Sequence, residues 1–425
     1  MNKPRFWMNK KDFFTATFIV AMVSLFCAFF YYVAKEGTDS FQLNIIYGRG
    51  ANYLADFFNV AKYSASKDPY HDTTTNLSEK GYLPISYLLF YLFGQFADYK
   101  TLDATTAGYS ASGLAFATLI VGIFAAILLI QLYDLKDGNK FVRFMTVMLF
   151  TCSSVFIFAY ERGNIIFLAV SLSLFFLVCY KSENKILREL ALISLAFAAA
   201  LKGYPAILGL LLIHDKKFFA AVRCCIYGLL LMFLPFLFFI GGFNNVHQWY
   251  KNVKANTAQY RYYPSPRYGI YYFLKYLTEF KKYHVEKILL FGSYALYGLG
   301  ILSTFFHKKL WKIIAILVAI IIFMPVNSAV YCGLYILPVI VLFLNDDEHS
   351  WFDFVYLLFF ILILCPMQFS YHSQNLTLFL NNVALLGILG FLTLEGIILL
   401  VKKIVKWRRG RKNVNKCNSA SIQGS

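Results

Sequence analysis

The sequence has little charge, and acidic charge in particular is scarce. Only 15% of the 425 residues are charged, against about a quarter in typical soluble domains. Asp and Glu together number 22, against 40 Lys and Arg, while 59% of the residues are hydrophobic. Apolar runs long enough to cross about 30 Å of hydrocarbon recur along the chain. The composition therefore excludes an ordinary soluble protein and predicts an all-α, polytopic membrane protein.

Several chemistries also lack their signatures. There is no Walker-type phosphate loop, which argues against nucleotide hydrolysis, and the hydropathy pattern predicts no cytoplasmic domain for a nucleotide-sugar donor. The eight cysteines show neither metal-ligand spacing nor a disulfide framework, and we interpret them as packing residues. The acidic run Asp346–Glu348 resembles a metal site, but a solvated cytoplasmic turn is the favoured interpretation. No metal site is predicted.

The basic residues flank the apolar spans. Lys3, Arg5, Lys10 and Lys11 precede the first apolar run, and residues 402–416 carry eight Lys and Arg with no acid. Because positive residues mark cytoplasmic ends, both termini are predicted to be cytoplasmic. Anionic membrane lipids, and not nucleic acid, are then the expected partners of this charge. The first run, 13–34, is too long for a signal-peptide core and predicts a retained helix.

The hydropathy pattern predicts a single integral membrane domain over residues 1–425, with about 10–13 transmembrane or re-entrant helices. The expected parts outside the membrane are a cytoplasmic N-terminus (1–12), a first outer loop with an amphipathic helix (35–80), a second outer loop (241–284) and a basic cytoplasmic tail (402–425). The apolar segments lie near 13–34, 82–97, 108–133, 141–159, 165–180, 190–213, 218–240, 286–305, 310–325, 328–344, 351–366 and 376–401.

Two topologies are open for the middle of the chain. Five full spans between residues 82 and 213 would place the Lys-bearing connectors near Lys136 and Lys185 outside, against the positive-inside rule. The rule is satisfied if 82–97 is a partial span and Pro205 breaks 190–213 into a re-entrant pair. We favour this second topology, because irregular backbone at membrane depth is tolerated where it lines a cavity.

Two polar interruptions stand out within the apolar sequence: Glu161–Asn164 and Lys202–Pro205. A cation near the centre of a membrane helix costs about 2.5–3.5 kcal/mol on insertion scales. Such residues persist where they face something polar, and here a buried anion is the favoured interpretation. The alternatives are that Arg162 pairs with Glu161 or another acid, or extends to the interface. Asn164 is equally suited to cap the following helix.

Asp56 is the strongest candidate base. Residues 51–65 carry apolar side chains at helical spacing, which predicts an amphipathic helix on the membrane surface. A carboxylate among aromatic residues at an interface can accept a proton from a hydroxyl group. The alternative is a charge on the first turn or solvated face of a helix.

The second outer loop is rich in aromatic and basic residues, and these suit either sugar binding or an interfacial aromatic belt. They are Trp249, Tyr250, Tyr260, Arg261, Tyr262, Tyr263, Arg267 and Tyr268. His71, His247 and His372 lack metal-ligand spacing, and we interpret them as surface residues.

Four motifs in this order resemble the GT-C membrane glycosyltransferases, and specifically glycosyltransferase family 87, which uses polyprenyl phosphate mannose. They are Asp56–Ala61 with Asp68–Tyr70, Gly81–Pro84, Arg162–Asn164 and Lys202–Pro205. The resemblance covers residues 40–240 well and the C-terminal third mainly by hydropathy. Where some members carry a His pair before a late Leu-Pro, this chain has Tyr331-Cys332 before Leu337-Pro338. That histidine role would pass to Tyr331, Tyr335 or His372.

The resemblance implies an inverting transferase that moves a hexose, mannose or glucose, from a polyprenyl phosphate to an envelope glycan or glycolipid outside the inner membrane. It implies Asp56 as the base and Lys202 and Arg162 as phosphate ligands. The other substrate-binding candidates that it implies are Asn164, Tyr204, Tyr82 and Tyr331, and the second outer loop adds Arg261, whose side chain can hydrogen-bond hydroxyls or phosphates. No cofactor is implied, and a divalent cation lacks support because Asp56 has no second acid within two residues.

Two alternatives of other classes stay open. An O-antigen-type polymerase would depend on loop arginines such as Arg261 and Arg267, and it would tolerate the loss of Asp56. A lipid-linked glycan flippase or transporter would show pseudo-symmetric halves, which the sequence does not show.

Overall fold

The computed structural model describes residues 9–37, 53–71, 80–96, 110–259, 282–325, 330–371 and 374–422. The regular secondary structure of this part of the chain is helical, apart from one pair of two-residue strands. The all-α prediction is confirmed. The elements are α1 (Lys10–Glu36), α3 (Ala55–Ser64), α4 (Pro84–Phe93), α6 (Ala111–Leu135), α7 (Lys140–Thr151), α8 (Ser154–Glu161), α9 (Ile166–Cys179), α10 (Lys185–Lys202), η3 (Tyr204–Gly209), α11 (Leu210–His214), α12 (Phe218–Phe233), η4 (Leu234–Phe238), η5 (Gly242–Asn244), α13 (Asn245–Gln259), α15 (Lys282–Thr304), α16 (Leu310–Phe323), η7 (Val330–Tyr335), α17 (Ile336–Leu344), α18 (Asp353–Leu364), β1 (Ser370–Tyr371), β2 (Gln374–Asn375) and α19 (Leu376–Ile422).

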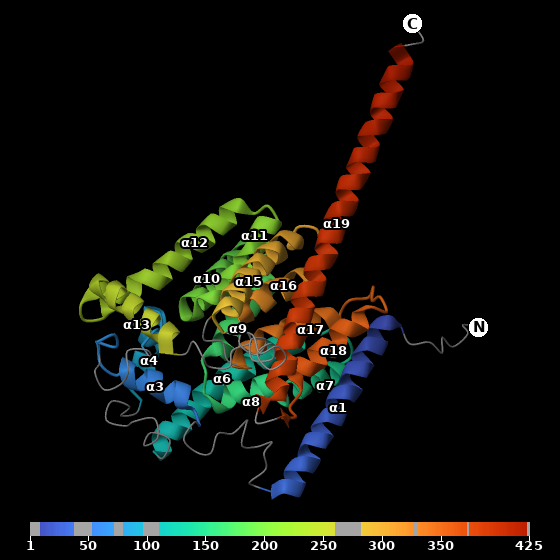
Figure 1. Ribbon diagram of the computed structural model, residues 1–425. Coiled ribbons are helices and arrows are strands. Elements are labelled where there is room, and N and C mark those ends of the chain that lie inside the picture. Colours follow the sequence, from blue (N-terminus) through green and yellow to red (C-terminus); the bar gives the residue numbers. More distant parts are fainter. Residues whose placement is uncertain are drawn as a thin grey trace.

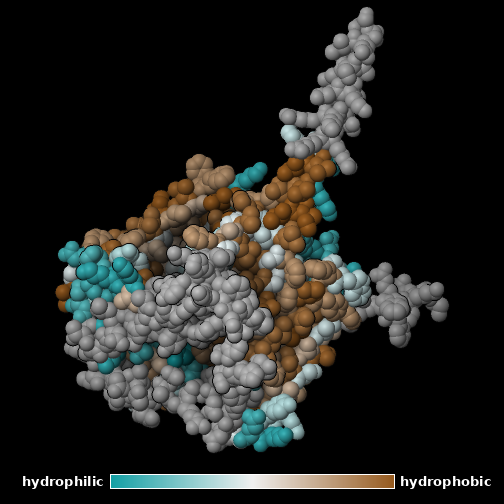
Figure 2. Space-filling model, in the orientation of Figure 1, coloured by the Kyte–Doolittle hydropathy of each residue, from teal (hydrophilic) through white to brown (hydrophobic). Residues whose placement is uncertain are grey.

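Four helical stretches of the described chain are long and apolar enough to cross a membrane: α1, α6, α12 with η4, and residues 376–407 of α19. Figure 1 shows α1 and α19 on one side of the bundle and α3, α4 and α13 on the other. In Figure 2 hydrophobic surface covers α12 and the part of α19 beside the bundle. Only 6% of the apolar window of α12 is buried within the protein, as expected of a helix that faces lipid.

Other apolar helices are short or bent. The pair α7 and α8 meets at 57°, where the Ser153 hydroxyl accepts a hydrogen bond from the backbone N–H of Phe156 and starts a new helix. The ten residues of α4 span roughly 15 Å at about 1.5 Å per residue, half the hydrocarbon thickness. The described part of the predicted segment 82–97 therefore forms only a partial span. The break expected at Gly203–Pro205 is also present, because α10 ends at Lys202 and Gly203 has φ +74°.

The connectors gather with the start of α1 at one end of the bundle, here called the N-terminal end. Lys11 pairs with Asp137 after α6 (3.0 Å) and with Asp347 after α17 (3.2 Å). Lys309, which precedes α16, pairs with Asp346 (2.7 Å).

The connectors after α9 and α11 lie at the same end. Lys181 pairs with Asp215 (2.7 Å), and the ring of His214 stacks on Phe305, which follows α15. The Lys-bearing connectors thus share an end with the N-terminus, as the favoured topology requires. Because α8 and α10 run away from this end, Glu161–Asn164 and Lys202–Pro205 lie at the opposite one.

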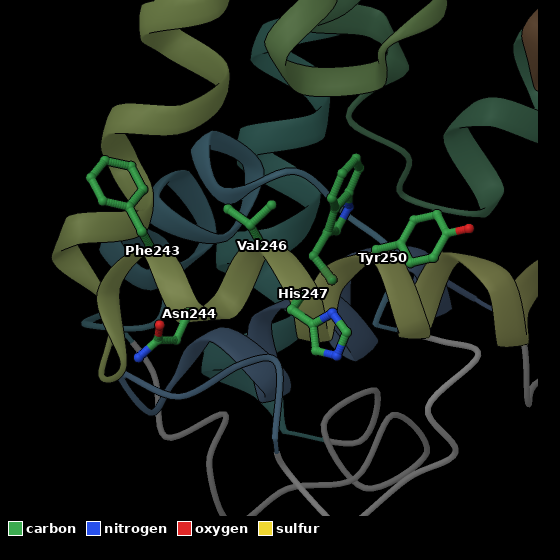
Figure 3. Close-up of a pocket in the computed structure, with 6 residues that line it drawn as sticks. Phe243, Asn244, Val246, His247 and Tyr250 are labelled. Carbon is green, nitrogen blue, oxygen red and sulfur yellow. The ribbon is translucent and has the colours of Figure 1, made fainter.

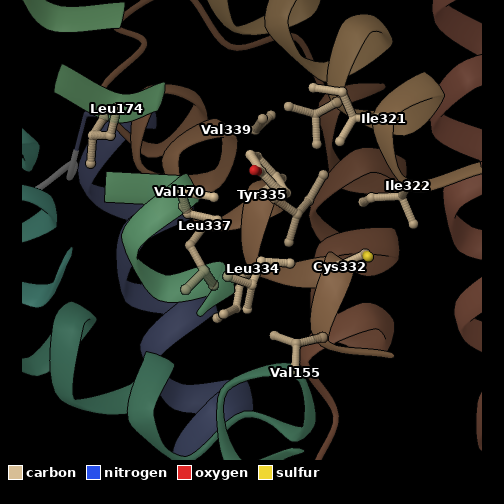
Figure 4. Close-up of a cluster of buried hydrophobic side chains, with 14 of the residues drawn as sticks. Val155, Val170, Leu174, Ile321, Ile322, Cys332, Leu334, Tyr335, Leu337 and Val339 are labelled. Carbon is tan, nitrogen blue, oxygen red and sulfur yellow. The ribbon is translucent and has the colours of Figure 1, made fainter. Parts of the chain in front are cut away.

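The core lies around α16, whose residues from Ile313 to Phe323 are all buried. A helix that is apolar all round lies in a protein core or in lipid, and the burial of these side chains places α16 in the core. Figure 4 shows side chains of α8, α9, α16, η7 and α17 meeting in this core, among them Val155 and Leu334. A Cβ atom on Gly333 would lie 2.5 Å from Cγ1 of Val155. The absence of a side chain at Gly333 therefore lets η7 pack closely against α8.

Candidate functional site

The start of α3 joins the end of α8 through the main chain. The N–H of Leu54 donates to the carbonyl oxygen of Glu161 (2.6 Å), and the N–H of Asp56 donates to that of Arg162 (3.0 Å). The free N–H groups at a helix start thereby satisfy the free carbonyls at a helix end. This junction fixes the backbone of Asp56 relative to Arg162, although 106 residues separate the two in sequence.

Gly163 allows the start of α3 to approach the end of α8 closely. Its φ is +63°, a conformation that glycine adopts without strain. A Cβ atom there would lie 2.9 Å from Cδ2 and 3.0 Å from Cα of Leu54, and 3.1 Å from Cβ of Phe57. Both the backbone conformation and the space therefore require glycine at this position.

The prediction that residues 51–65 lie as a helix on the membrane surface is wrong in part. A helix forms, but Phe57, Phe58, Val60 and Tyr63 are all buried. The ring of Phe57 packs against Phe90 of α4, 5.0 Å away between centroids, and also against Phe93. The apolar face that could have faced lipid is instead covered by protein, because α4 offers aromatic partners and the main-chain junction holds α3 against the end of α8.

The Asp56 carboxylate receives three hydrogen bonds. Nε and Nη2 of Arg162 donate to Oδ1 (3.1 and 2.6 Å), and Nδ2 of Asn164 donates to Oδ2 (2.6 Å). The Asp56 side chain is 16% exposed and that of Arg162 is 25% exposed. An ionised carboxylate offers about four acceptor positions, so one is left for a substrate hydroxyl.

Two of the sequence alternatives can now be decided. Arg162 does pair with an acid, but this acid is Asp56 and not Glu161. Asn164 does cap the following helix, because its Oδ1 accepts the N–H of Ile166 (3.0 Å), yet its amide nitrogen also holds Asp56. The same side chain therefore starts α9 and orients the carboxylate.

Asp56, Arg162 and Asn164 are here called the Asp56 cluster. Lys202, the last residue of α10, lies beside it. Its Nζ lies 4.9 Å from the ring centroid of Tyr82 and 5.7 Å from that of Tyr331. The side chain is partly buried and lies within electrostatic range of Asp56. Lys202 forms no ion pair with a carboxylate in the part of the chain that the structure describes. The cation thus has aromatic neighbours and no bonded counter-ion.

Tyr204 and the segment η7 complete this side of the site. Sγ of Cys332 lies 3.7 Å from the Tyr204 hydroxyl, and the Tyr204 ring meets that of Tyr335 edge to face at 5.8 Å. Tyr331 stacks on Phe158 of α8. Sequence reasoning missed Cys332, because a cysteine in an apolar run is typical of packing.

Two candidate residues, Arg261 and His372, lie outside the described residues. His71 forms a 2.8 Å contact between its Nδ1 and Oδ1 of Asp68. Among the described residues, no group of three His, Cys, Asp or Glu side chains could hold a metal ion.

An open groove of about 720 Å³ lies along α13 (Figure 3) and is separate from the Asp56 cluster. Phe243, Asn244, Val246, His247, Trp249 and Tyr250 line it. The indole N–H of Trp249 donates to the carbonyl oxygen of Gly81 (3.1 Å), the residue before Tyr82. This hydrogen bond therefore places the Trp249 side of the groove next to Tyr82, one of the two tyrosines beside Lys202.

In a comparison with known protein families, residues 82–269 fit the family model of glycosyltransferase family 87. No curated protein and no solved structure matches the chain. The matched segment contains Tyr82, Arg162, Asn164, Lys202 and Tyr204, whereas Asp56 and Tyr331 lie outside it. This match confirms the resemblance to glycosyltransferase family 87 that the sequence motifs predicted, and it supports a glycosyltransferase.

Proposed function

We propose that the protein is an inverting glycosyltransferase with a polyprenyl phosphate sugar as donor. One observation carries the choice of donor: Lys202 is a partly buried cation that no described carboxylate pairs with. Burying an unpaired charge is costly, and a bound anion would remove that cost. A lipid phosphate is the anion that a sugar donor of a membrane enzyme supplies.

In the proposed reaction Asp56 takes the proton of the acceptor hydroxyl. The hydroxyl oxygen forms a bond to the anomeric carbon while the bond between that carbon and the phosphate oxygen breaks. The phosphate leaves with the electron pair, and a single displacement inverts the anomeric centre. Because the leaving phosphate is a stable anion, no second carboxylate is needed to protonate it.

The cations have separate tasks in this proposal. Lys202 stabilises the departing phosphate through charge-assisted hydrogen bonds. Arg162 orients Asp56 with two of its N–H donors, and a guanidinium has about three more. No acceptor among the described residues is bonded to these remaining donors, so they can bind the donor phosphate as well, and orientation of Asp56 and phosphate binding are compatible roles.

The proposed location follows from charge. Lys10, Lys11 and Lys309 lie at the N-terminal end of the bundle, and basic residues favour the cytoplasmic side. The Asp56 cluster then faces outward across the inner membrane, with both termini cytoplasmic. The acceptor would be an envelope glycan or glycolipid on that side, and the transferred hexose would be mannose or glucose.

The test is transfer of radiolabelled sugar in membranes, supplied as polyprenyl phosphate mannose or polyprenyl phosphate glucose. We expect Asp56→Asn to lower the rate by about 10²–10⁴, the usual contribution of a general base. Lys202→Ala should weaken use of the donor. Asp137→Asn, which removes an exposed acid at the N-terminal end, is the matched control and should transfer normally.

Each result bears on a different part of the proposal. Activity that survives Asp56→Asn contradicts the assignment of the base. Absence of transfer from both donors in the wild type would exclude a mannose or glucose donor and would direct attention to the polymerase and flippase alternatives.

A further inference from the structure

Two tyrosine rings flank the ammonium group of Lys202, and they come from distant parts of the chain. Tyr82 precedes α4, and Tyr331 lies in η7, 249 positions later by subtraction of the two residue numbers. Both centroids are within about 6 Å of Nζ, the range in which a cation is attracted to a ring face. The three side chains form what we call the Lys202 clamp.

Each ring is held in place by contacts that do not involve Lys202. The Tyr70 hydroxyl donates to the carbonyl oxygen of Tyr82 (3.4 Å), and the Tyr82 ring meets that of Tyr87. Tyr331 stacks on Phe158, with the ring planes 18° apart. The rings are therefore fixed parts of the site, and the flexible member of the clamp is the lysine.

A ring face and a carboxylate have different effects on a neighbouring lysine. A carboxylate would attract the ammonium but would also accept its N–H groups, and so compete with a phosphate for them. A ring face attracts the charge while the three N–H donors stay available for oxygen acceptors. The clamp thus restricts a long side chain without occupying the donors that an anion needs.

We propose that Tyr82 and Tyr331 are positioning residues, which hold the Lys202 ammonium ready for the phosphate of the sugar donor. This inference rests on the proposed function. It also gives η7, which lies outside the segment that matches the family model, a part in donor binding. The two hydroxyl groups are not needed for this role, whereas the two rings are.

The test measures binding of polyprenyl phosphate, the product of donor cleavage, to the purified full-length protein in detergent. No turnover is needed. The variants are Lys202→Ala, Tyr331→Phe and Tyr331→Leu, with Tyr82→Phe and Tyr82→Leu as an independent pair. Thermal unfolding of each variant identifies any that fail to fold, and in that case the other ring decides the outcome.

We expect Lys202→Ala and Tyr331→Leu each to weaken binding roughly tenfold, the size of a desolvated cation–ring interaction. Tyr331→Phe should bind within about twofold of wild type, since it keeps the ring. The double variant Lys202→Ala/Tyr331→Leu should be little worse than Lys202→Ala alone, because a ring that acts through the lysine has no effect without it.

The outcomes separate the two proposals. Additive losses in the double variant, or a loss in Tyr331→Phe as large as in Tyr331→Leu, would show direct contact with the ligand and overturn the clamp. Normal binding by Tyr331→Leu and Tyr82→Leu, with weak binding by Lys202→Ala, would overturn the clamp alone. If the wild type neither binds polyprenyl phosphate nor transfers from its sugar conjugates, the proposed function fails.

Discussion

The two ends of the helical bundle both collect charged side chains, but they satisfy them differently. At the N-terminal end Lys11 pairs with two aspartates, and Lys309 pairs with Asp346. At the opposite end Asp56 keeps an acceptor position beyond its bonds to Arg162 and Asn164, and Lys202 has two ring faces beside it and no ion pair with a carboxylate of the described residues.

This difference separates two uses of an ion pair. The pairs at the N-terminal end join connectors that are far apart in sequence, and the Asp137 and Asp347 partners of Lys11 are 59% and 81% exposed, so water takes their remaining bonds. The Asp56–Arg162 pair also joins distant segments, but it is largely buried and leaves donors and an acceptor for another molecule. Unused bonding capacity in a largely buried pair is what indicates chemistry at this end.

Apart from the loss of the base itself, the largest expected effect comes from Gly163→Ala, which would break the junction of α3 and α8. The new Cβ would clash with Leu54 and Phe57, and φ of +63° adds backbone strain of about 1–3 kcal/mol. Because α3 must move, we expect sugar transfer to fall more than about 100-fold, by analogy with small misplacements of catalytic groups. Transfer assays at matched expression measure this loss.

The matched control is Gly138→Ala at the N-terminal end. Gly138 also has positive φ, +112°, but its Cβ would meet Val142 at an ordinary 3.6 Å. In Gly138→Ala the backbone strain should lower the free energy of unfolding and leave sugar transfer unchanged. Equal losses of transfer in the two variants would show that the junction has no special role.

The next effect is that of Arg162→Lys, which keeps the charge but removes the planar guanidinium. Nε and Nη2 both reach Oδ1 of Asp56, and a lysine cannot reproduce this paired geometry. We expect kcat/KM to drop about tenfold, corresponding to about 1.4 kcal/mol. The reciprocal change at the N-terminal end, Lys309→Arg, should alter kcat/KM by less than about twofold. A tenfold drop of kcat/KM in Lys309→Arg as well would remove the distinction between the two ends.

A smaller effect, on stability alone, is expected from Asp346→Asn. Burial tends to raise the pKa of Asp346, but Lys309, the N–H of Glu348 and the indole of Trp311 outweigh it and hold this pKa below 3.8. A carboxylate with a lowered pKa stabilises the fold above about pH 4, and this contribution disappears as the pH falls through the folded-state pKa.

We therefore expect Asp346→Asn to lower Tm by about 1 °C at pH 7, for a loss of about 1 kcal/mol. The Tm difference should shrink between pH 7 and pH 3, as Asp346 of the wild type becomes protonated, while transfer at neutral pH stays unchanged. A Tm difference that is the same at both pH values would contradict an electrostatic origin.

The smallest effect is expected from Ser86→Ala. The Ser86 hydroxyl donates to the carbonyl oxygen of Leu201 (2.9 Å) and so ties α4 to the end of α10, next to Lys202. Losing it should cost about 0.5–1.5 kcal/mol in stability and raise KM for the donor by about twofold. Ser64→Ala removes a bond within α3, to the carbonyl oxygen of Val60 (2.6 Å), and should leave KM unchanged. A KM change in both variants would point to a general loss of rigidity.

Much of the fold could be predicted from the sequence because lipid imposes strong rules on it. Apolar runs predicted the helices, and the positive-inside rule favoured the topology with a partial span at 82–97 and a break at Pro205. Asp56, Arg162 and Lys202 stood out because apolar packing cannot explain a charge in such surroundings.

What the sequence could not give are the contacts between distant segments. Nothing in the spacing of Asp56 and Arg162 predicts that they meet, nor that Gly163 permits their approach. The burial of α3 depends on Phe90 and Phe93 of α4, whose positions follow from the whole packing arrangement. Cys332 beside Tyr204 is likewise a result of how η7 returns to α8.

The assembly of the site from segments between residues 54 and 332 also has a consequence for biogenesis. Synthesis proceeds from the N-terminus, so Asp56 leaves the ribosome long before Arg162, Lys202 and Tyr331. Until α8 arrives, the N–H groups at the start of α3 lack the carbonyl partners of Glu161 and Arg162. The base is therefore set in its final place only after α8 has been made, and a nascent chain halted before η7 would expose an incomplete site to the membrane insertion machinery.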